Sequence, residues 1–390
     1  MRAGVDRRAM AALSGGHLAV DFASGAVPAM LPFLRDRFGL SYALTAAVML
    51  CATIASSLVQ PLFGLVSDRR GAIWLLPAGV GLAGVGTALA ALTHVYGLVL
   101  VFVFLTGLGV AAFHPEGAKF AAFASGRRRA SGMALFNIGG NTGYALGPLV
   151  VTPLMLSLGL DGAALVALPI ALGAAALWRT LPYLRGIAPP RARRDADTPA
   201  AEQPGALAVL LTVVVLRSVA FFGLLTFAPL YLASRGESSH WLLALMLLAG
   251  AAGTLTLGPV ADRIGLRRTL LVTQAAIAPL IVVFLVEGGA WGTLALMGVA
   301  VCVVGTYGVT MVLSQQYLPR HVALASGLNV GLAVGLGGVA AVCLGLVADA
   351  VDLRTALALS AAAPVLGVLL CLLLPAPAAR RRLAVEAVAP

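Results

Sequence analysis

The sequence predicts an all-α membrane protein with twelve transmembrane helices in two pseudo-symmetric six-helix bundles. Three observations lead to this prediction. The chain is 60% hydrophobic and only 11% charged, with a mean hydropathy of +0.99, which is too apolar for a water-soluble domain. Its apolar residues form twelve runs, each near the roughly 20 residues that cross a bilayer. Finally, the segment Gly64–Gly71 returns in related form as Gly258–Gly265, so the chain is an internal duplication.

The spans of the first half follow from the apolar runs in chain order. The first run comes after three arginines, but it is too long for a secretory signal and contains Asp21 and Pro28, so we expect it to be retained as a span. The second run leads into the Asp68-Arg69 turn, and the remaining runs are separated by short polar segments. The predicted spans are 11–34, 42–66, 72–93, 97–118, 130–157 and 162–182.

A proline-rich segment with clustered arginines and acids separates the two halves, and it predicts a solvated linker. The second half repeats the order of the first, with the Asp262-Arg263 turn after its second span. Its predicted spans are 206–233, 240–261, 269–287, 291–316, 321–348 and 353–375. We therefore predict an N-terminal bundle over 1–183, a cytoplasmic linker over 184–205, a C-terminal bundle over 206–378 and a cytoplasmic tail over 379–390.

The 26 basic residues are distributed unevenly between the two sides of this topology. With a cytoplasmic N-terminus, Arg35, Arg37, Arg235 and Arg354 fall outside, Arg217 falls within a span, and every other Lys and Arg falls inside. The positive-inside rule then predicts that the protein lies in the cell inner membrane with both termini on the cytoplasmic side. The net charge of +11 reflects this topology, so we expect no nucleic-acid partner.

The sequence also excludes several kinds of chemistry. A phosphate-binding loop needs a lysine after glycine, but the only lysine is Lys119, which follows Ala118. The polar turns are too short for a soluble catalytic domain, so the protein is not expected to be an enzyme or to carry a cofactor. The four cysteines lie in apolar runs without metal-ligand spacing, so no metal site is expected.

A Gly-x-x-x-Asp-Arg-x-Gly turn follows the second span of each half. This duplicated turn resembles that of the major facilitator superfamily. The twelve spans and the central linker resemble the same superfamily. The motif residues are Gly64, Asp68, Arg69, Gly258, Asp262 and Arg263. The second turn carries Arg267-Arg268, whereas the first has Ala72-Ile73 where this family usually shows basic residues. We interpret the motif residues as turn and latch residues that contact neighbouring helix ends.

Shorter motifs are similar to the fosmidomycin-resistance type of drug exporters within that superfamily. They comprise His17, Asp21 and Pro32-Phe33-Leu34, then Phe113–Gly117, Phe136–Asn141 and Gly147-Pro148. This resemblance implies proton-coupled export of small drug-like or antimetabolite compounds by alternating access, with protons, a small-molecule substrate and the bilayer as partners of a monomer. Import of a small organic solute, or a receptor that has lost transport, remain as alternatives.

Ionisable residues inside spans are costly and mark sites of ion or substrate handling. Asp21 and His17 share one helical face because they are four residues apart. They are proton-coupling candidates together with His114 and Glu116, and Asp21 is expected to be the principal one. Arg217, near the repeat equivalent of Asp21, is expected to be its charge partner or to bind an anionic substrate. In the fold that the chain resembles, all these residues converge on a central cavity.

Structural roles remain open for the same residues. Asp21 and Arg217 can form a pair that ties the halves together, His17 can be held by hydrogen bonds at a helix end, and Glu116 with Lys119 can form an interfacial ion pair. The glycine rows from Gly139 and from Gly327 repeat every four residues and predict close helix packing. The uncharged candidates for substrate contact are Asn137, Asn141, Phe222, Tyr307, Gln315 and Asn329.

Overall fold

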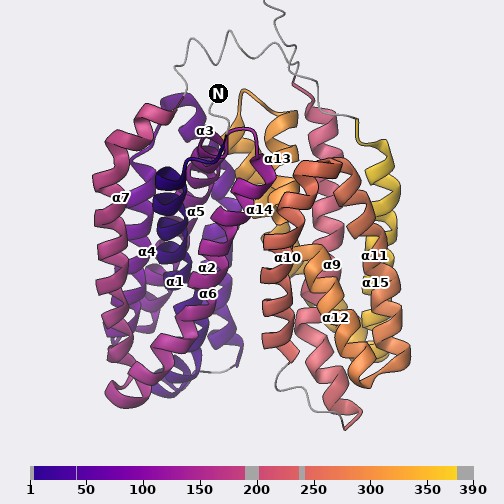
Figure 1. Ribbon diagram of the computed structural model, residues 1–390. Helices are drawn as coiled ribbons and strands as arrows, with labels where there is room; N and C mark the ends of the chain where they lie inside the picture. The colour runs from indigo at the N-terminus through magenta and orange to yellow at the C-terminus, as the bar shows by residue number, and fades with distance from the viewer. Residues whose placement is uncertain (1–3, 41, 189–201, 237–241, 376–390) are drawn as a thin grey trace, which may run out of the picture.

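The computed structural model describes residues 4–40, 42–188, 202–236 and 242–375 (Figure 1). The predicted tail and most of the predicted linker lie outside these residues. The ends of the linker region are helical, because α7 continues to Ile187 and α9 begins at Pro204.

The helices form two groups that follow the chain order (Figure 1). The first group contains α1 Arg7–Phe38, α2 Tyr42–Leu58, α3 Gln60–Arg70, α4 Leu75–Leu92, α5 Tyr96–Ala124, α6 Arg129–Leu158, the 3₁₀ helix η1 Leu160–Val166 and α7 Ala167–Ile187. The second contains α9 Pro204–Ser234, α10 Leu242–Ile264, α11 Leu266–Glu287, α12 Gly289–Val304, α13 Tyr307–Tyr317, α14 Val322–Ala350 and α15 Leu353–Leu373. The described residues contain no strand, so the all-α prediction is confirmed.

Ten helical segments of the described chain are long and apolar enough to cross a membrane. They correspond to ten of the twelve predicted spans. The other two predicted spans coincide with α6, of 30 residues, and α10, of 23 residues, so both exceed the length that a bilayer requires. Many large side chains on the outer faces are exposed apolar ones, such as Leu156 and Leu172, as expected for a surface in contact with lipid.

Two predicted spans are interrupted in the structure. The span at 42–66 divides into α2 and α3 at Val59, because Pro61 has no N–H to donate and its ring disfavours a continuous helix. The span at 291–316 divides into α12 and α13 at Gly305 and Thr306. A Cβ at Gly305 would lie 2.7 Å from the Gly253 carbonyl carbon, so this break also lets α12 approach α10 closely.

Glycine rows govern two helix contacts, as the four-residue spacing predicts. On α6, a Cβ at Gly139 or Gly143 would clash with the backbone of α1, at Ser14 and Leu18. On α14, a Cβ at Gly331 would lie 2.5 Å from the Ser57 carbonyl oxygen of α2. The first row therefore packs two helices of one half, whereas the second packs helices of different halves.

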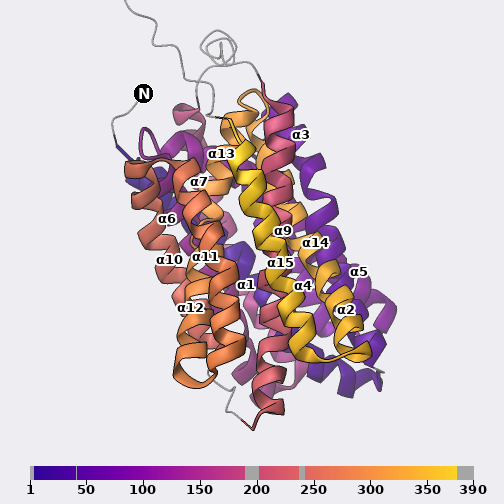
Figure 2. The ribbon, with the colours of Figure 1, turned by 90° about the vertical axis from the view of Figure 1, so that its right-hand side faces the viewer.

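In the second half, α9 packs mainly against α14 and α15 (Figure 2). Contacts between the halves come mainly from α14 against α2, α3 and α5, and from α6 against α10 and α13. The short helices α3 and α13 lie at the same edge of the molecule (Figure 1). This edge, where α7 ends and α9 begins, is called the linker end below.

Candidate functional site

Three ionisable side chains from α1 and α5 meet in the interior of the first half. His17 Nε2 lies 3.3 Å from Asp21 Oδ2, and His114 Nε2 lies 3.4 Å from Asp21 Oδ1. The two Nε2 atoms are 3.1 Å apart. All three side chains are largely buried, with 7%, 17% and 13% of the side-chain surface of His17, Asp21 and His114 exposed. We call these residues the His-Asp-His cluster.

Backbone carbonyls fix the orientation of both imidazole rings. His17 Nδ1 lies 2.9 Å from the Phe136 carbonyl oxygen, and His114 Nδ1 lies 2.8 Å from the Val110 carbonyl oxygen. Because a carbonyl oxygen only accepts, each Nδ1 must carry a hydrogen and donate it. In the neutral rings both Nε2 atoms are then unprotonated, so two nitrogen lone pairs and a carboxylate face one another. This arrangement requires a cation at its centre, whether a proton or a metal ion.

Aromatic packing and one glycine shape the cluster. The His17 ring stacks on Phe136 at 4.2 Å between centroids and lies 5.8 Å from Phe113. A Cβ at Gly140 would lie 2.6 Å from Asp21 Oδ2 and would clash with His17 Nε2. The close contact of α1 with α6 therefore brings bare glycine backbone beside the cluster and leaves room for it.

Glu116 belongs to a different cluster. Lys119 Nζ lies 2.7 Å from Glu116 Oε2, and the Ser67 hydroxyl of α3 contacts both side chains. Glu116 and Lys119 are 0% and 2% exposed, so the ion pair that the sequence suggested is formed and is buried in the protein. His114 and Glu116 are two residues apart and face opposite sides of α5, which is why only His114 joins Asp21.

Arg217 is not the charge partner of Asp21 in this structure. Its guanidinium donates to Thr306 Oγ1 at 2.6 Å and to Thr310 Oγ1 at 3.4 Å, and it lies 4.9 Å from the ring centroid of Tyr307. Arg217 is fully buried and its Nε has no hydrogen-bond partner. The break between α12 and α13 places Thr306 here. Arg217 and the His-Asp-His cluster therefore make separate contacts in this structure, and their convergence on one central cavity stays a prediction.

The duplicated motif joins the two halves at the linker end. The Asp68 carboxylate of α3 accepts hydrogen bonds from the backbone N–H groups of Ala323 and Leu324, at the start of α14, at 3.2 and 2.9 Å. Gly64 allows this approach, because a Cβ there would lie 2.6 Å from the Ala323 carbonyl oxygen. Arg69 is exposed.

The second copy of the motif makes the reciprocal contact. The Asp262 carboxylate of α10 accepts hydrogen bonds from the N–H groups of Ala130 and Ser131, at the start of α6, at 3.1 and 3.0 Å. Gly258 packs there against Ala134, and Arg263 is exposed. Each aspartate thus caps a helix of the opposite half, where the partial positive charge of the helix N-terminus stabilises a carboxylate.

The uncharged candidates separate into packing residues and half-exposed ones. Gln315 Nε2 donates to the Ala118 carbonyl oxygen at 3.3 Å and to Ser326 Oγ at 3.0 Å, and Asn329 Nδ2 donates to Ser314 Oγ at 2.9 Å. Both are buried and bind protein groups. Phe222 packs against Gly337 of α14, and Tyr307 lies against Arg217. Phe222 and Tyr307 are partly exposed, as are Asn137 and Asn141 of α6.

Sequence reasoning missed a small cavity of about 120 Å³ between α1, α2, α5, α6 and α14, lined by apolar and hydroxyl-bearing residues. Ser24 lines it one helical turn beyond Asp21, and Tyr144 lines it one turn beyond Gly140. Thr53, Ser56 and Thr106 also line it. These residues occur singly in apolar runs, so no local motif identifies them.

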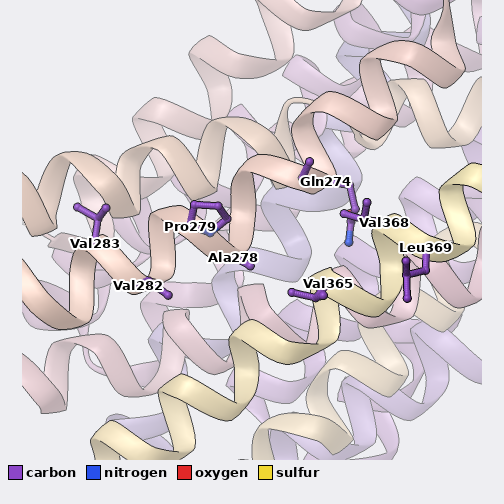
Figure 3. Close-up of a pocket in the computed structure, with 9 residues that line it drawn as sticks. Gln274, Ala278, Pro279, Val282, Val283, Val365, Val368 and Leu369 are labelled. Atoms are coloured by element: carbon purple, nitrogen blue, oxygen red, sulfur yellow. The ribbon is translucent and has the colours of Figure 1, made fainter.

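A larger groove of about 650 Å³ lies between α11 and α15 (Figure 3). Its lining is apolar except for Gln274, whose Nε2 donates to the Pro364 carbonyl oxygen at 3.2 Å. Val282, Val365 and Leu369 are each more than half exposed, so the groove belongs to the outer surface of the bundle. None of the ionisable residues described above lines it.

This fold and these ionisable residues inside the helices define a multi-pass membrane transporter. Residues 13–342 match the Major Facilitator Superfamily, and the chain belongs to this family. It is 32% identical over 372 residues to the uncharacterized MFS-type transporter YfnC of Bacillus subtilis, covering 92% of this chain and 90% of that one. It is 28% identical over 370 residues to the fosmidomycin resistance protein of Escherichia coli, covering 92% and 91%.

Solved structures have the same fold. The E. coli fucose:proton symporter FucP has a TM-score of 0.72 at 14% identity, covering 95% of this chain and all of that one. The human organic anion transporter MFSD10 has a TM-score of 0.72 at 17% identity, with 95% of this chain covered. The predicted superfamily and all-α membrane fold are thereby confirmed.

Proposed function

We propose that the protein is a proton-coupled exporter of small drug-like or antimetabolite compounds in the cell inner membrane, working as a monomer by alternating access. The observation that carries this proposal is the His-Asp-His cluster, in which two imidazole lone pairs face one carboxylate. A buried carboxylate without a compensating charge is costly inside a membrane. One proton bound to either imidazole makes the cluster neutral overall.

Proton coupling requires that the proton affinity of the cluster change during the transport cycle. His17 and Asp21 lie on α1, whereas His114 lies on α5, so movement of one helix against the other changes their separations. A separated imidazole no longer stabilises the ionised carboxylate, and this shifts the proton equilibrium. Relative movement of α1 and α5 thus links proton binding to conformation.

The substrate site is proposed to include the small cavity next to the cluster. Its hydroxyl groups come from the first half, and Val334 of α14 closes it from the second. A substrate bound in this cavity therefore contacts both halves, so its binding depends on their relative position. Arg217 provides a buried cation for an anionic substrate once the second half moves. Export is supported by the relative named fosmidomycin resistance protein.

The two aspartate contacts at the linker end are proposed to act as gates. Both join a helix of one half to the first turn of a helix of the other, so both must break before the halves separate at that end. The distribution of basic residues supports the proposal that this end and both termini are cytoplasmic. Opening of the two contacts then admits substrate from the cytoplasm.

The proposal is tested with purified protein in liposomes under an imposed pH difference, with candidate compounds selected by susceptibility profiling of cells with and without the protein. Uphill flux should occur with the proton gradient and stop when it is dissipated. Asp21→Asn should abolish gradient-driven flux and leave substrate exchange, because the amide mimics the protonated carboxyl with little change in volume. Glu116→Gln is the control, and the two variants are compared at matched amounts of folded protein because Glu116→Gln breaks a buried ion pair. Full coupled flux by Asp21→Asn, with loss only in Glu116→Gln, would contradict the assignment.

A further inference from the structure

Four donor atoms of the His-Asp-His cluster, the two Nε2 atoms and both carboxylate oxygens of Asp21, lie close enough together to surround one metal ion. The distances from His17 Nε2 to His114 Nε2 and to Asp21 Oδ2 are 3.1 and 3.3 Å, and the distance from His114 Nε2 to Asp21 Oδ1 is 3.4 Å. Bonds of about 2.0–2.1 Å in tetrahedral Zn²⁺ sites place neighbouring ligand atoms about 3.3 Å apart. The separation of the two Nε2 atoms, and that of each Nε2 from one of the two Asp21 oxygens, are close to this edge length.

The surroundings of the two imidazoles also match those of metal ligands. A ligating histidine donates its second ring N–H to a carbonyl or carboxylate, which fixes the tautomer and directs the other nitrogen at the metal. Both rings do this here, through Nδ1 to the carbonyl oxygens of Phe136 and Val110. Two independent backbone contacts therefore direct the two Nε2 lone pairs toward one point beside Asp21.

The donor set selects the kind of cation. Two imidazole nitrogens and one carboxylate suit Zn²⁺ and similar transition-metal ions, whereas Ca²⁺ and Mg²⁺ need a larger set of oxygen ligands. Three protein ligands leave a fourth position for water or another ligand, as in open zinc sites. Gly140 contributes no side chain here, and a Cβ on it would obstruct Asp21 Oδ2 and His17 Nε2.

We infer that His17, Asp21 and His114 bind one divalent transition-metal ion of the Zn²⁺ class within the membrane-spanning region. The ion joins α1 to α5, because two ligands come from one helix and one from the other. A bound ion thereby restrains the movement of these helices. This inference rests on the geometry of the cluster alone, and the ion and the proton of the proposed function compete for the same nitrogen lone pairs.

The test uses the full chain, purified in detergent without a polyhistidine tag and treated with a chelator. Co²⁺ replaces Zn²⁺ as a spectroscopic probe, because tetrahedral Co²⁺ absorbs visible light far more strongly than the hexa-aqua ion. One Co²⁺ per chain with a tetrahedral spectrum, displaced by one equivalent of Zn²⁺ and not by Mg²⁺ or Ca²⁺, is expected. Absence of a bound ion in the wild-type protein would overturn the inference.

Variants then locate the ion. His17→Gln and His114→Gln should each weaken binding at least on the order of 100-fold, since losing even an outer-shell partner costs roughly 10–100-fold. The matched controls are His94→Gln, at an exposed position, and His321→Gln, which removes the surface pair with Glu202. Binding that survives the cluster variants, or disappears in a control, would place the ion elsewhere and refute the site.

Gly140→Ala supplies a variant that keeps all three ligands. Its added methyl group obstructs the centre of the cluster, so binding should fall while helical content stays at the wild-type level by circular dichroism. Unchanged affinity in this variant would contradict the site even if a ligand variant failed to fold. Metal binding is measured in detergent without a proton gradient, whereas the proposed function is tested by flux in liposomes. A failure to bind metal is therefore distinct from a failure of proton-coupled flux.

Discussion

Asp68 Oδ2 lies 2.9 Å from the backbone nitrogen of Leu324, although 256 residues separate them in the chain. Asp262 and Ser131 form the reciprocal contact at 3.0 Å. A carboxylate at a helix N-terminus satisfies N–H groups that have no partner within the helix. The duplicated motif thus supplies two helix caps that hold the halves together at one end of the molecule.

Asp68→Ala and Asp262→Ala should each favour separation of the halves at the linker end. Loss of one cap costs about 0.5–2 kcal/mol, which corresponds to about a 2- to 30-fold change in the equilibrium between closed and open states. Spin labels at the exposed positions Arg70 and Arg320, in a background without the native cysteines, measure the distance by pulsed electron paramagnetic resonance. A longer-distance population should appear in both variants.

The control for these variants is Asp352→Ala. Asp352 caps α15 within the second half, accepting from the Thr355 N–H at 2.7 Å, a bond that also lowers the pKa of this carboxyl below its usual value. Its removal weakens a helix cap without touching the contact between halves. A distance distribution that changes in all three variants, or in none, would show that the motif aspartates are not latches.

Glu116 and Lys119 are expected to be needed as a pair for stability. Removing one partner of a buried ion pair leaves an uncompensated charge and costs about 3–5 kcal/mol, so Lys119→Met should lower the thermal unfolding temperature in detergent clearly. The double variant Glu116→Gln/Lys119→Met should recover much of this loss. Disruption of the exposed pair between Arg37 and Asp161, through Asp161→Asn, should cost at most about 1 kcal/mol. A small effect of Lys119→Met, equal to that of Asp161→Asn, would contradict the buried pair.

Arg217→Met should leave thermal stability unchanged or raised, and should lower transport of anionic compounds at least 10-fold. Among the described residues only neutral groups contact this guanidinium, and its Nε is unpartnered, so its desolvation is poorly compensated. Arg267→Met, at an exposed guanidinium that donates to the Leu372 carbonyl oxygen, is the control. Marked destabilisation of Arg217→Met with undiminished transport of anionic compounds would assign Arg217 a purely structural role.

Cysteines introduced at His94 and Arg127 should lie on opposite sides of the membrane. Both positions are exposed, and only α5 separates them. An impermeant thiol reagent applied to intact cells should label the cysteine at position 94, and should label that at 127 only after permeabilisation. The reverse pattern would invert the proposed orientation, and labelling of both from outside would mean that α5 does not span.

The apolar runs and the repeat determined the membrane fold, because the length of an apolar run and the bilayer thickness are local quantities. The break at Pro61 also had a local signal, since proline interrupts a helix. The break at Gly305 and Thr306 had none, because it depends on the approach of α12 to α10 and on Arg217. The pairing of His17 with Asp21 on one helical face was likewise a consequence of spacing alone.

Partners from different helices were decided only by the tertiary structure. Spacing along α1 cannot tell whether Asp21 meets Arg217 or His114, and the structure joins it to His114 because glycines of α6 and the orientation of α5 position the three side chains. The same holds for Glu116, which contacts Ser67 and Lys119. The sequence by itself determined which residues are ionisable within the membrane. The packing of the helices decided which of them share a site, since contact energies depend on distances that chain order does not contain.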